Sequence, residues 1–164
     1  MTLGKKYQKI YFACKDQVWS VISKYLDNQQ DREDLFQEVF VKVYRALPKF
    51  REEAAASTWV YRITINSALT YIKKRDRYRW LKQIIGHFRE EETTLEQAAS
   101  EELMLAPLLK LNAQQKIILL LAEVEEKKLD EIAELLSLPL GTVKSTLHRA
   151  REIVKKEVEK NGGV

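Results

Sequence analysis

Polar and basic side chains near the C-terminus recur at helical spacing, with apolar residues between them. The polar set is Lys144, Ser145, His148, Arg149 and Arg151. On the opposite side of the same helix, an apolar stripe would hold it against a core: Val143, Leu147, Ala150 and Val154. A helix that displays basic and hydrogen-bonding groups can contact base edges and phosphates in the major groove of DNA. The chemistry that this pattern indicates is recognition of nucleic acid.

The preceding residues complete a helix-turn-helix pattern across residues 129–151. Apolar residues at three- and four-residue steps predict a first helix: Leu129, Ile132, Ala133, Leu135 and Leu136. Pro139 and Gly141 then predict a turn, and the Thr142 side chain can cap a second helix that begins near it. Helical pairs of this kind also occur without any DNA contact, and a basic outer face can be a solvated surface alone.

Composition favours a helical protein that binds a charged partner. The chain has 164 residues, of which 45% are hydrophobic, enough for one or two small cores, and its 5 Gly and 3 Pro favour long helices. The net charge of +4 is compatible with nucleic acid, and the charges are unevenly distributed. Residues 73–82 carry six basic residues and one acidic residue, whereas residues 90–102 carry six glutamates and no Lys or Arg. These two segments are therefore expected to face different partners.

Several function classes lack support in the sequence. Cys14 is the single cysteine, so no intrachain disulfide is possible, and it forms no zinc-binding spacing with the two histidines. Neither histidine belongs to a recognisable catalytic arrangement, so we predict no catalytic residue, no metal and no cofactor. The apolar runs are too short to cross a bilayer and no targeting segment is evident, which predicts a cytoplasmic protein without membrane insertion.

The order of the predicted helices indicates an all-α protein of two small domains. Helices are expected over residues 5–26, 32–47 and 57–74, with Asp31 as a cap for the second. Asn112 and Gln115 fit a capping box that opens a further helix. The acidic stretch between these groups predicts a first domain at residues 1–85, an extended linker at 86–106 and a second domain at 107–164.

Two motifs ahead of the linker resemble region 2 of bacterial sigma factors. They read DREDLFQEVFVKVYRALPKF at residues 31–50 and STWVYRITINSALTYIKKR at residues 57–75, and residues 129–151 are similar to region 4 of the same family. The short two-region layout resembles the extracytoplasmic-function (ECF) group. The resemblance implies a protein that binds core RNA polymerase and directs promoter recognition, DNA melting and transcription initiation. It also implies an anti-sigma factor as a possible partner.

The resemblance assigns a polymerase-binding role to one helix. It implies that Asp34, Leu35, Gln37 and Glu38 dock on the clamp helices of the polymerase β′ subunit. Exposed carboxylates and an amide can pair with arginines of a partner helix. The alternative is that Asp34 and Glu38 are ordinary solvated residues, although like charges four residues apart mildly oppose a helix.

DNA contacts are implied in both domains. Promoter opening requires a pocket for an unstacked base, and the resemblance implies that the downstream-promoter site comprises Trp59, Arg62, Asn66, Lys73, Lys74 and Arg75. Trp59 can instead be a core residue. The upstream-promoter site comprises Thr142, Lys144, Ser145, His148, Arg149 and Arg151. Among these, Asn66 stands where the family places its base-reading asparagine.

The chain departs from the family pattern at several positions. Ala56 and Ser57 replace an aromatic and a basic residue that often form a wall of the base pocket. Glu126 and Lys128 stand where a glycine turn and a capping serine are common, and Thr146 replaces a frequent arginine. These differences are expected to weaken local capping or to change which bases are read.

Two other functions remain open at this point. A free-standing helix-turn-helix repressor or activator would need its own dimerisation surface and would not explain the residues around Asp34 or Asn66. A helical adaptor for other proteins would show no response to promoter DNA. Copurification with core polymerase distinguishes the first of these from a sigma factor.

Overall fold

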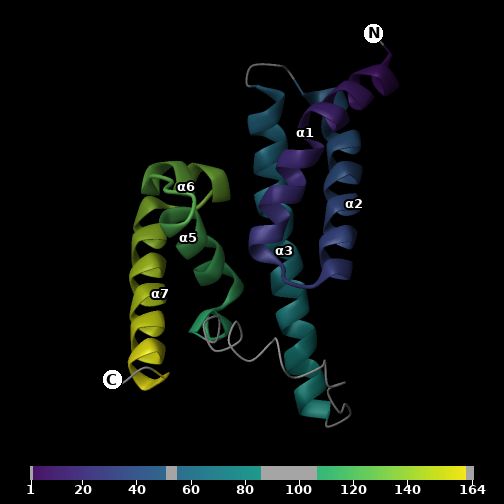
Figure 1. The fold of residues 1–164 in the computed structure, drawn as a ribbon. Helices are drawn as coiled ribbons and strands as arrows, with labels where there is room; N and C mark the ends of the chain where they lie inside the picture. The colour runs from purple at the N-terminus through teal and green to yellow at the C-terminus, as the bar shows by residue number, and fades with distance from the viewer. Residues whose placement is uncertain (1, 51–54, 86–106, 162–164) are drawn as a thin grey trace. The chain divides into compact units, whose positions relative to one another are not determined.

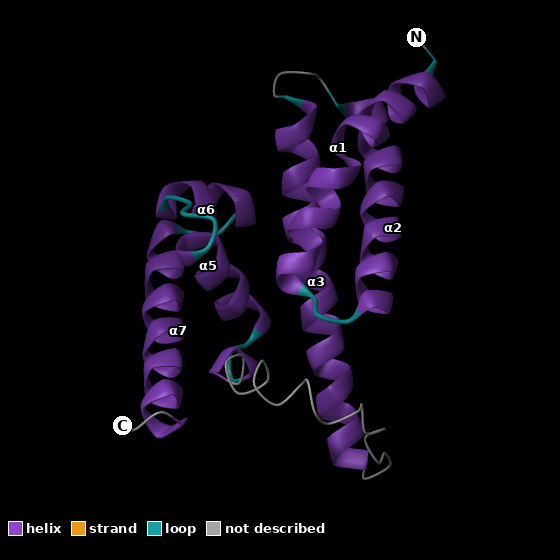
Figure 2. Ribbon diagram, in the orientation of Figure 1, coloured by secondary structure: helices purple, strands orange, loops and turns teal. Residues whose placement is uncertain are grey.

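The computed structural model describes residues 2–50, 55–85 and 107–161, and the described part is built from helices joined by loops (Figures 1 and 2). The helices are α1 (Leu3–Tyr25), α2 (Gln29–Ala46), a short 3₁₀ helix η1 (Leu47–Lys49), α3 (Ala56–Ile85), α5 (Ala113–Glu123), α6 (Leu129–Leu136) and α7 (Leu140–Asn161). No strand occurs among the described residues. The chain forms two compact units, residues 1–71 and 72–164, so the division falls within α3. The predicted linker at 86–106 lies outside the described residues.

The first unit packs α1 against α2 and the first part of α3. The apolar residues of α1 that recur at helical spacing are all buried, namely Ile10, Cys14, Val18, Val21, Ile22 and Tyr25. Aromatic rings join α1 to α2, with the centroids of Tyr11 and Phe40 4.7 Å apart in an edge-to-face arrangement. The helix begins two residues before the predicted start and ends one residue before the predicted end, within the usual range for helix termini.

The N-terminus of α2 differs from the prediction. Asn28, not Asp31, caps the helix, because its side-chain oxygen accepts a hydrogen bond of 3.1 Å from the backbone N–H of Asp31. The helix therefore starts at Gln29. The Asp31 carboxylate instead accepts a 2.9 Å hydrogen bond from the hydroxyl of Tyr71 and so ties α2 to α3. The Asp31 side chain, which was predicted to cap α2, thus makes a tertiary contact with α3.

Helix α3 continues well beyond the predicted end at residue 74. Its 30 residues include no Gly or Pro, so the basic segment that follows the bundle extends the helix. Within the bundle it buries two polar side chains, Thr64 and Ser67. The Thr64 hydroxyl donates a 2.8 Å bond to the carbonyl of Val60, which satisfies it locally.

In the second unit, α5 and α6 both pack against α7. The predicted capping box is confirmed: the Asn112 side chain accepts from Gln115 N–H at 2.9 Å, and the Gln115 side chain accepts from Asn112 N–H at 3.0 Å. The core is formed largely by the predicted apolar stripes, and its buried members include Ile117, Ile118, Leu121, Ile132, Leu136, Val143, Leu147 and Ala150.

The turn between α6 and α7 is built differently from the prediction. Helix α7 begins at Leu140, and Thr142 lies in its first turn with its N–H bonded to the carbonyl of Pro139 at 3.0 Å. Thr142 therefore does not cap the helix, and Gly141 is an ordinary helical residue. The left-handed residue is Ser137, with φ of 53°, at the end of α6. Proline can precede a helix without losing a bond, because the first helical turn leaves its N–H groups unpaired.

The buried cysteine of α1 lies outside the candidate sites. Cys14 is 1% exposed, and burial raises the pKa of its thiol, so the thiol stays protonated at neutral pH. Within the described ranges, no group of three or more His, Cys, Asp or Glu residues is arranged to hold a metal ion. None of the helices described there is both long and apolar enough to cross a membrane.

Candidate polymerase and nucleic-acid interfaces

The predicted docking residues of α2 divide between surface and core. Asp34 and Gln37 are exposed and Glu38 is half-buried. Leu35 is fully buried at 0% exposure, so it anchors α2 to the bundle and has no surface with which to contact a partner. The exposed part of the predicted docking set is therefore polar.

The two carboxylates of this face have different surroundings. Asp34 accepts a 3.1 Å hydrogen bond from the Gln30 side chain one turn earlier on the same helix. Glu38 forms an ion pair of 2.6 Å with Lys42, one turn later. Lys42 therefore offsets part of the repulsion between Asp34 and Glu38.

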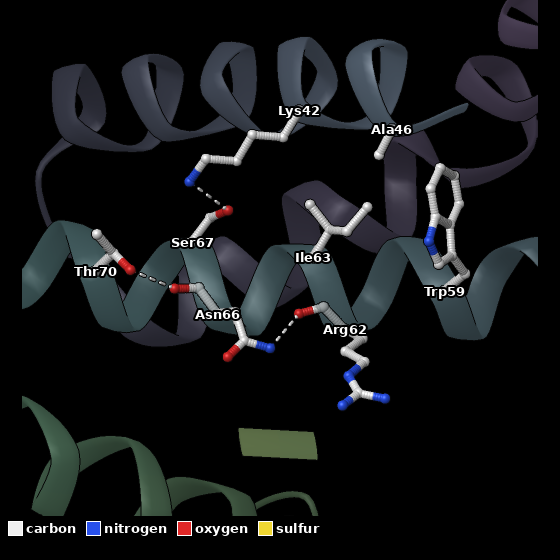
Figure 3. A pocket seen from close by; sticks show the side chains of 8 residues that line it. All are labelled: Lys42, Ala46, Trp59, Arg62, Ile63, Asn66, Ser67 and Thr70. Carbon is white, nitrogen blue, oxygen red and sulfur yellow. Dashed lines mark hydrogen bonds between the residues drawn. The ribbon is translucent and has the colours of Figure 1, made fainter. Parts of the chain in front are cut away.

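A pocket of about 360 Å³ lies between α2 and α3 (Figure 3). It brings together cationic, amide, hydroxyl and apolar side chains, and it is lined by Lys42, Ala46, Trp59, Arg62, Ile63, Asn66, Ser67 and Thr70. Such a lining can contact a planar heterocycle through its apolar wall and a phosphate through its cations. Three of the predicted downstream-promoter residues, Trp59, Arg62 and Asn66, thus meet in one pocket.

Hydrogen bonds within α3 fix the outer edge of this pocket. The Asn66 amide donates a 2.9 Å bond to the carbonyl of Arg62, and the Thr70 hydroxyl donates a 2.9 Å bond to the carbonyl of Asn66. The side chains of Asn66 and Arg62 point away from α2 (Figure 3). The Asn66 side chain is therefore held against its own helix, at the edge of the pocket that faces away from α2.

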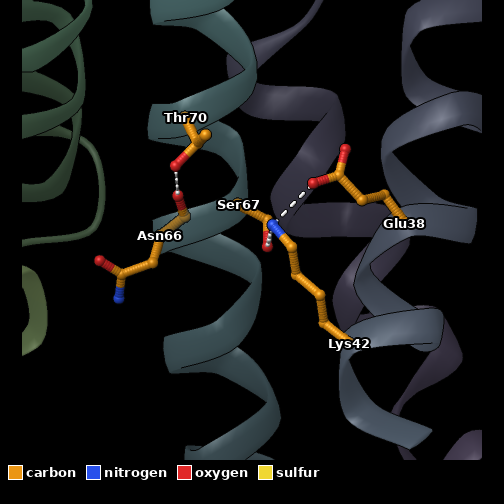
Figure 4. A network of polar contacts seen from close by, with 5 residues as sticks. All are labelled: Glu38, Lys42, Asn66, Ser67 and Thr70. Carbon is orange, nitrogen blue, oxygen red and sulfur yellow. Dashed lines mark hydrogen bonds and ion pairs between the residues drawn. The ribbon is translucent and has the colours of Figure 1, made fainter. Parts of the chain in front are cut away.

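The inner side of the pocket is held by a contact between the two helices. Ser67 is 2% exposed, and its hydroxyl accepts a 3.1 Å bond from the ammonium of Lys42 (Figure 4). The same ammonium is paired with Glu38, so one cation joins the docking face to the pocket.

Trp59 is both a packing residue and a pocket wall. Its ring is half-buried and stacks on Phe50 with centroids 4.5 Å apart and an interplanar angle of 21°. Ala56 is the first residue of α3 and Ser57 is exposed, so neither brings an aromatic ring to the pocket. Phe50, which was not among the predicted site residues, adds aromatic surface beside the predicted Trp59.

The basic residues further along α3 form a separate surface. Lys73 and Lys74 are exposed and Arg75 is half-buried, with its Nε 3.9 Å from a carboxylate oxygen of Asp76. None of the three lines the pocket.

Sequence reasoning missed five pocket residues: Lys42, Ala46, Ile63, Ser67 and Thr70. Thr70 could have been found, because it lies one helical turn after Asn66. The two residues from α2 could not, because no local pattern shows which face of α2 meets α3.

On α7 the predicted upstream-promoter residues separate into two groups. Lys144, Ser145, His148 and Arg149 are exposed, whereas Thr142 is half-buried in the first turn. The guanidinium of Arg151 forms two bonds to one carboxylate oxygen of Glu123 on α5, from Nε at 2.8 Å and from Nη2 at 2.6 Å. Arg151 is also exposed, and this ion pair joins α7 to α5.

The departures from the family pattern near α6 have local consequences. Glu126 adopts a left-handed conformation with φ of 51°, which a glycine would adopt without steric cost. Lys128 precedes α6 and its side chain makes no capping bond, although its N–H donates a 2.8 Å bond to the Glu131 side chain. Half of a capping box is therefore present.

Two family profiles match the chain, one in each half. The profile of Sigma-70 region 2 matches residues 10–78, and that of Sigma-70 region 4 matches residues 102–154. The chain is also 30% identical to the ECF RNA polymerase sigma-E factor of Escherichia coli K12, over 94% of this chain and 87% of that protein. The chain belongs to the ECF sigma factors.

Other relatives agree with this assignment. The sigma factor is 29% identical to the ECF RNA polymerase sigma-E factor of Haemophilus influenzae, over 94% of this chain and 88% of the relative. Its fold is similar to that of the sigma factor RpoE from Bartonella quintana, solved in complex with the anti-sigma factor NepR. That match has a TM-score of 0.60 and 18% identity, and it covers 94% of this chain and 98% of RpoE. This sigma factor binds core RNA polymerase and directs it to promoters for transcription initiation.

Proposed function

We propose that this sigma factor divides its work between three surfaces. The polar face of α2 with Asp34, Gln37 and Glu38 docks on core polymerase. The pocket between α2 and α3 holds a base of the melted downstream promoter element. The outward face of α7 reads the upstream element as a duplex. The first two surfaces belong to a domain of residues 1–85, and the third belongs to a domain of residues 107–164.

The observation that carries the proposal is the composition of the pocket around Asn66. A flipped base requires hydrogen-bonding groups for its edge, an apolar or aromatic wall for its ring and cations for the adjoining phosphates. Asn66 offers the amide, Ile63 and Trp59 offer the wall, and Lys42 and Arg62 offer the cations. Lys73, Lys74 and Arg75 extend the positive surface along α3 for the strand that leaves the pocket.

The proposed role of α7 rests on its convex, exposed set of side chains. Arg149 can make two parallel bonds to a guanine, whereas Lys144 offers a single point charge. His148 and Ser145 complete the surface on the same side of the helix. We assign Arg151 to the packing of α7 on α5, because both of its bonds go to Glu123.

The proposal extends to the setting in which the protein acts. It is a specificity subunit that performs no covalent chemistry and works in the cytoplasm with the polymerase. The structurally similar RpoE of Bartonella quintana was solved with an anti-sigma factor. We propose that an anti-sigma protein also restrains this chain by covering its polymerase-binding or DNA-binding surfaces.

The experiment that tests the proposal is recovery of the tagged chain from the bacterium that encodes it, followed by sequencing of the bound DNA. We expect core polymerase and DNA fragments that share two separated sequence elements. The double variant Asp34→Lys, Glu38→Lys tests the docking face, because Asp34 is exposed, the Glu38 side chain is 43% exposed, and charge reversal opposes pairing with polymerase arginines. Unchanged recovery of polymerase with this variant would show that α2 does not dock as proposed.

A further inference from the structure

The ammonium of Lys42 is shared between the proposed polymerase face and the proposed base pocket. It lies 2.6 Å from a carboxylate oxygen of Glu38 and 3.1 Å from the Ser67 hydroxyl, and it lines the pocket beside Asn66 (Figure 4). A lysine ammonium has three donors, and in the free protein two of them are directed to Glu38 and Ser67.

The partners of Lys42 differ in how they are held. Ser67 is buried in α3 and cannot leave the contact without disturbing the bundle. Glu38 has a side chain that is 43% exposed on α2 and can turn to an external cation. Asp34 lies on the same face but accepts its hydrogen bond from Gln30 on its own helix. The ion pair of Lys42 is with Glu38.

We propose that Lys42 is a positioning residue that couples polymerase docking to capture of the promoter strand. A polymerase arginine that pairs with Glu38 competes with Lys42 for the Glu38 carboxylate. The positive charge of the arginine also repels the Lys42 ammonium. Lys42 then stays on Ser67 and directs its charge to a phosphate or base oxygen in the pocket. This inference rests on the proposed function and adds the residue through which the two surfaces communicate.

The exchange makes a thermodynamic prediction with a definite sign. If polymerase binding frees Lys42 for the strand, the strand must raise the affinity for polymerase by the same factor. In the free protein, Glu38 restrains Lys42 and therefore opposes strand binding. Removing the Glu38 charge should strengthen strand binding in the absence of polymerase, while removing the Lys42 charge should abolish the coupling.

The test measures the affinity of the full-length chain for core polymerase, with and without a saturating single strand. The strand carries the downstream element found by sequencing the recovered DNA. The ratio of the two affinities is the coupling factor. We expect Lys42→Met, which keeps the length of the side chain, to lower this factor about tenfold, and Lys42→Arg to restore part of it. Lys9→Met removes an equivalent exposed charge on α1 and should leave the factor unchanged.

A second measurement uses the free chain and the same fluorescently labelled strand. The Glu38→Gln variant should bind the strand about fivefold more tightly than the Asp34→Asn variant. Asp34→Asn is the matched control, because it makes the same change in net charge on the same helix. Equal strand affinities of these two variants, or a wild-type coupling factor in Lys42→Met, would overturn the coupling role. Thermal unfolding of each variant checks that the bundle is intact.

Different results would contradict the proposed function itself. If the wild-type chain with polymerase does not bind the strand, or if Asn66→Ala binds it equally well, the pocket is not the base site. Binding by wild type that depends on Asn66 but shows no coupling would retain the proposed function and reject the role of Lys42.

Discussion

Helices α3 and α7 are both proposed to contact DNA, but they present their polar groups in opposite ways. On α3 the groups line a pocket and bond to the protein itself: Asn66 donates to Arg62, Thr70 donates to Asn66, and Ser67 accepts from Lys42 of α2. On α7 the outward residues are exposed, and Ser145 bonds only within its own turn, to the carbonyl of Thr142 at 3.1 Å.

The difference follows from the form of DNA that each helix would read. An unstacked base has lost its neighbours, so a pocket must replace stacking and pairing with contacts that are already in place. A duplex offers its base edges in an open groove, so a convex helix with extended side chains is sufficient. The comparison teaches that preorganisation is concentrated in the unit proposed to melt DNA.

The largest effect is expected from filling the pocket. Ala46→Phe places a ring in the space beside Ile63, and we expect it to reduce strand binding by about 3 kcal/mol, the upper contribution of one stacked base. Asn66→Ala removes one polar group and should cost less, about 1 kcal/mol. Fluorescence anisotropy with the single strand measures both variants in the presence of polymerase. Binding of upstream duplex through α7 is the control and should not change.

If Ala46→Phe opened promoters as well as the wild type, the contrast between α3 and α7 would lose its basis. Permanganate reactivity of unpaired thymines reports this opening directly.

An intermediate effect is expected on α7. Arg149→Ala should weaken binding to the upstream duplex by about 2 kcal/mol if the guanidinium reads a base, with relaxed preference at one position. A phosphate contact would instead weaken all sequences alike and reduce the salt dependence. Arg151→Ala is the matched control on the same helix, because its guanidinium is bonded to Glu123.

For Arg151→Ala we expect a loss of unfolding free energy below about 1 kcal/mol, as for other exposed ion pairs, with little change in DNA affinity. A larger loss of DNA affinity for Arg151→Ala than for Arg149→Ala would reverse the orientation assigned to this face.

The smallest effect concerns the turn before α6. Glu126→Gly should raise the free energy of unfolding by about 0.5 to 1 kcal/mol, because the left-handed conformation carries no steric cost for glycine. Glu134→Gly, at an exposed position inside α6, should lower it by about 1 kcal/mol. Chemical denaturation monitored by circular dichroism measures both, and DNA affinity should stay constant. Destabilisation by Glu126→Gly would contradict the strained turn.

Local sequence patterns were sufficient for most of the helices. The spacing of apolar residues predicted the buried faces of α1, α6 and α7, and the Asn112 and Gln115 capping box is confirmed. Such features depend on residues within a few positions of each other, so they can be derived from the chain alone. The same reasoning failed at Asp31 and Thr142, because Asn28 caps α2 while Asp31 bonds to Tyr71, and α7 begins directly after Pro139.

The two motifs in order indicated the family, and the resemblance to sigma region 2 indicated the proposed polymerase and base-binding surfaces at Asp34, Glu38, Arg62 and Asn66. Only the tertiary structure showed that Lys42 and Ala46 of α2 complete the pocket, that Leu35 is buried, and that Arg151 pairs with Glu123. The reason is physical. A helix fixes the direction of its side chains about its own axis, whereas the packing of helices against one another decides which of those directions meet a partner.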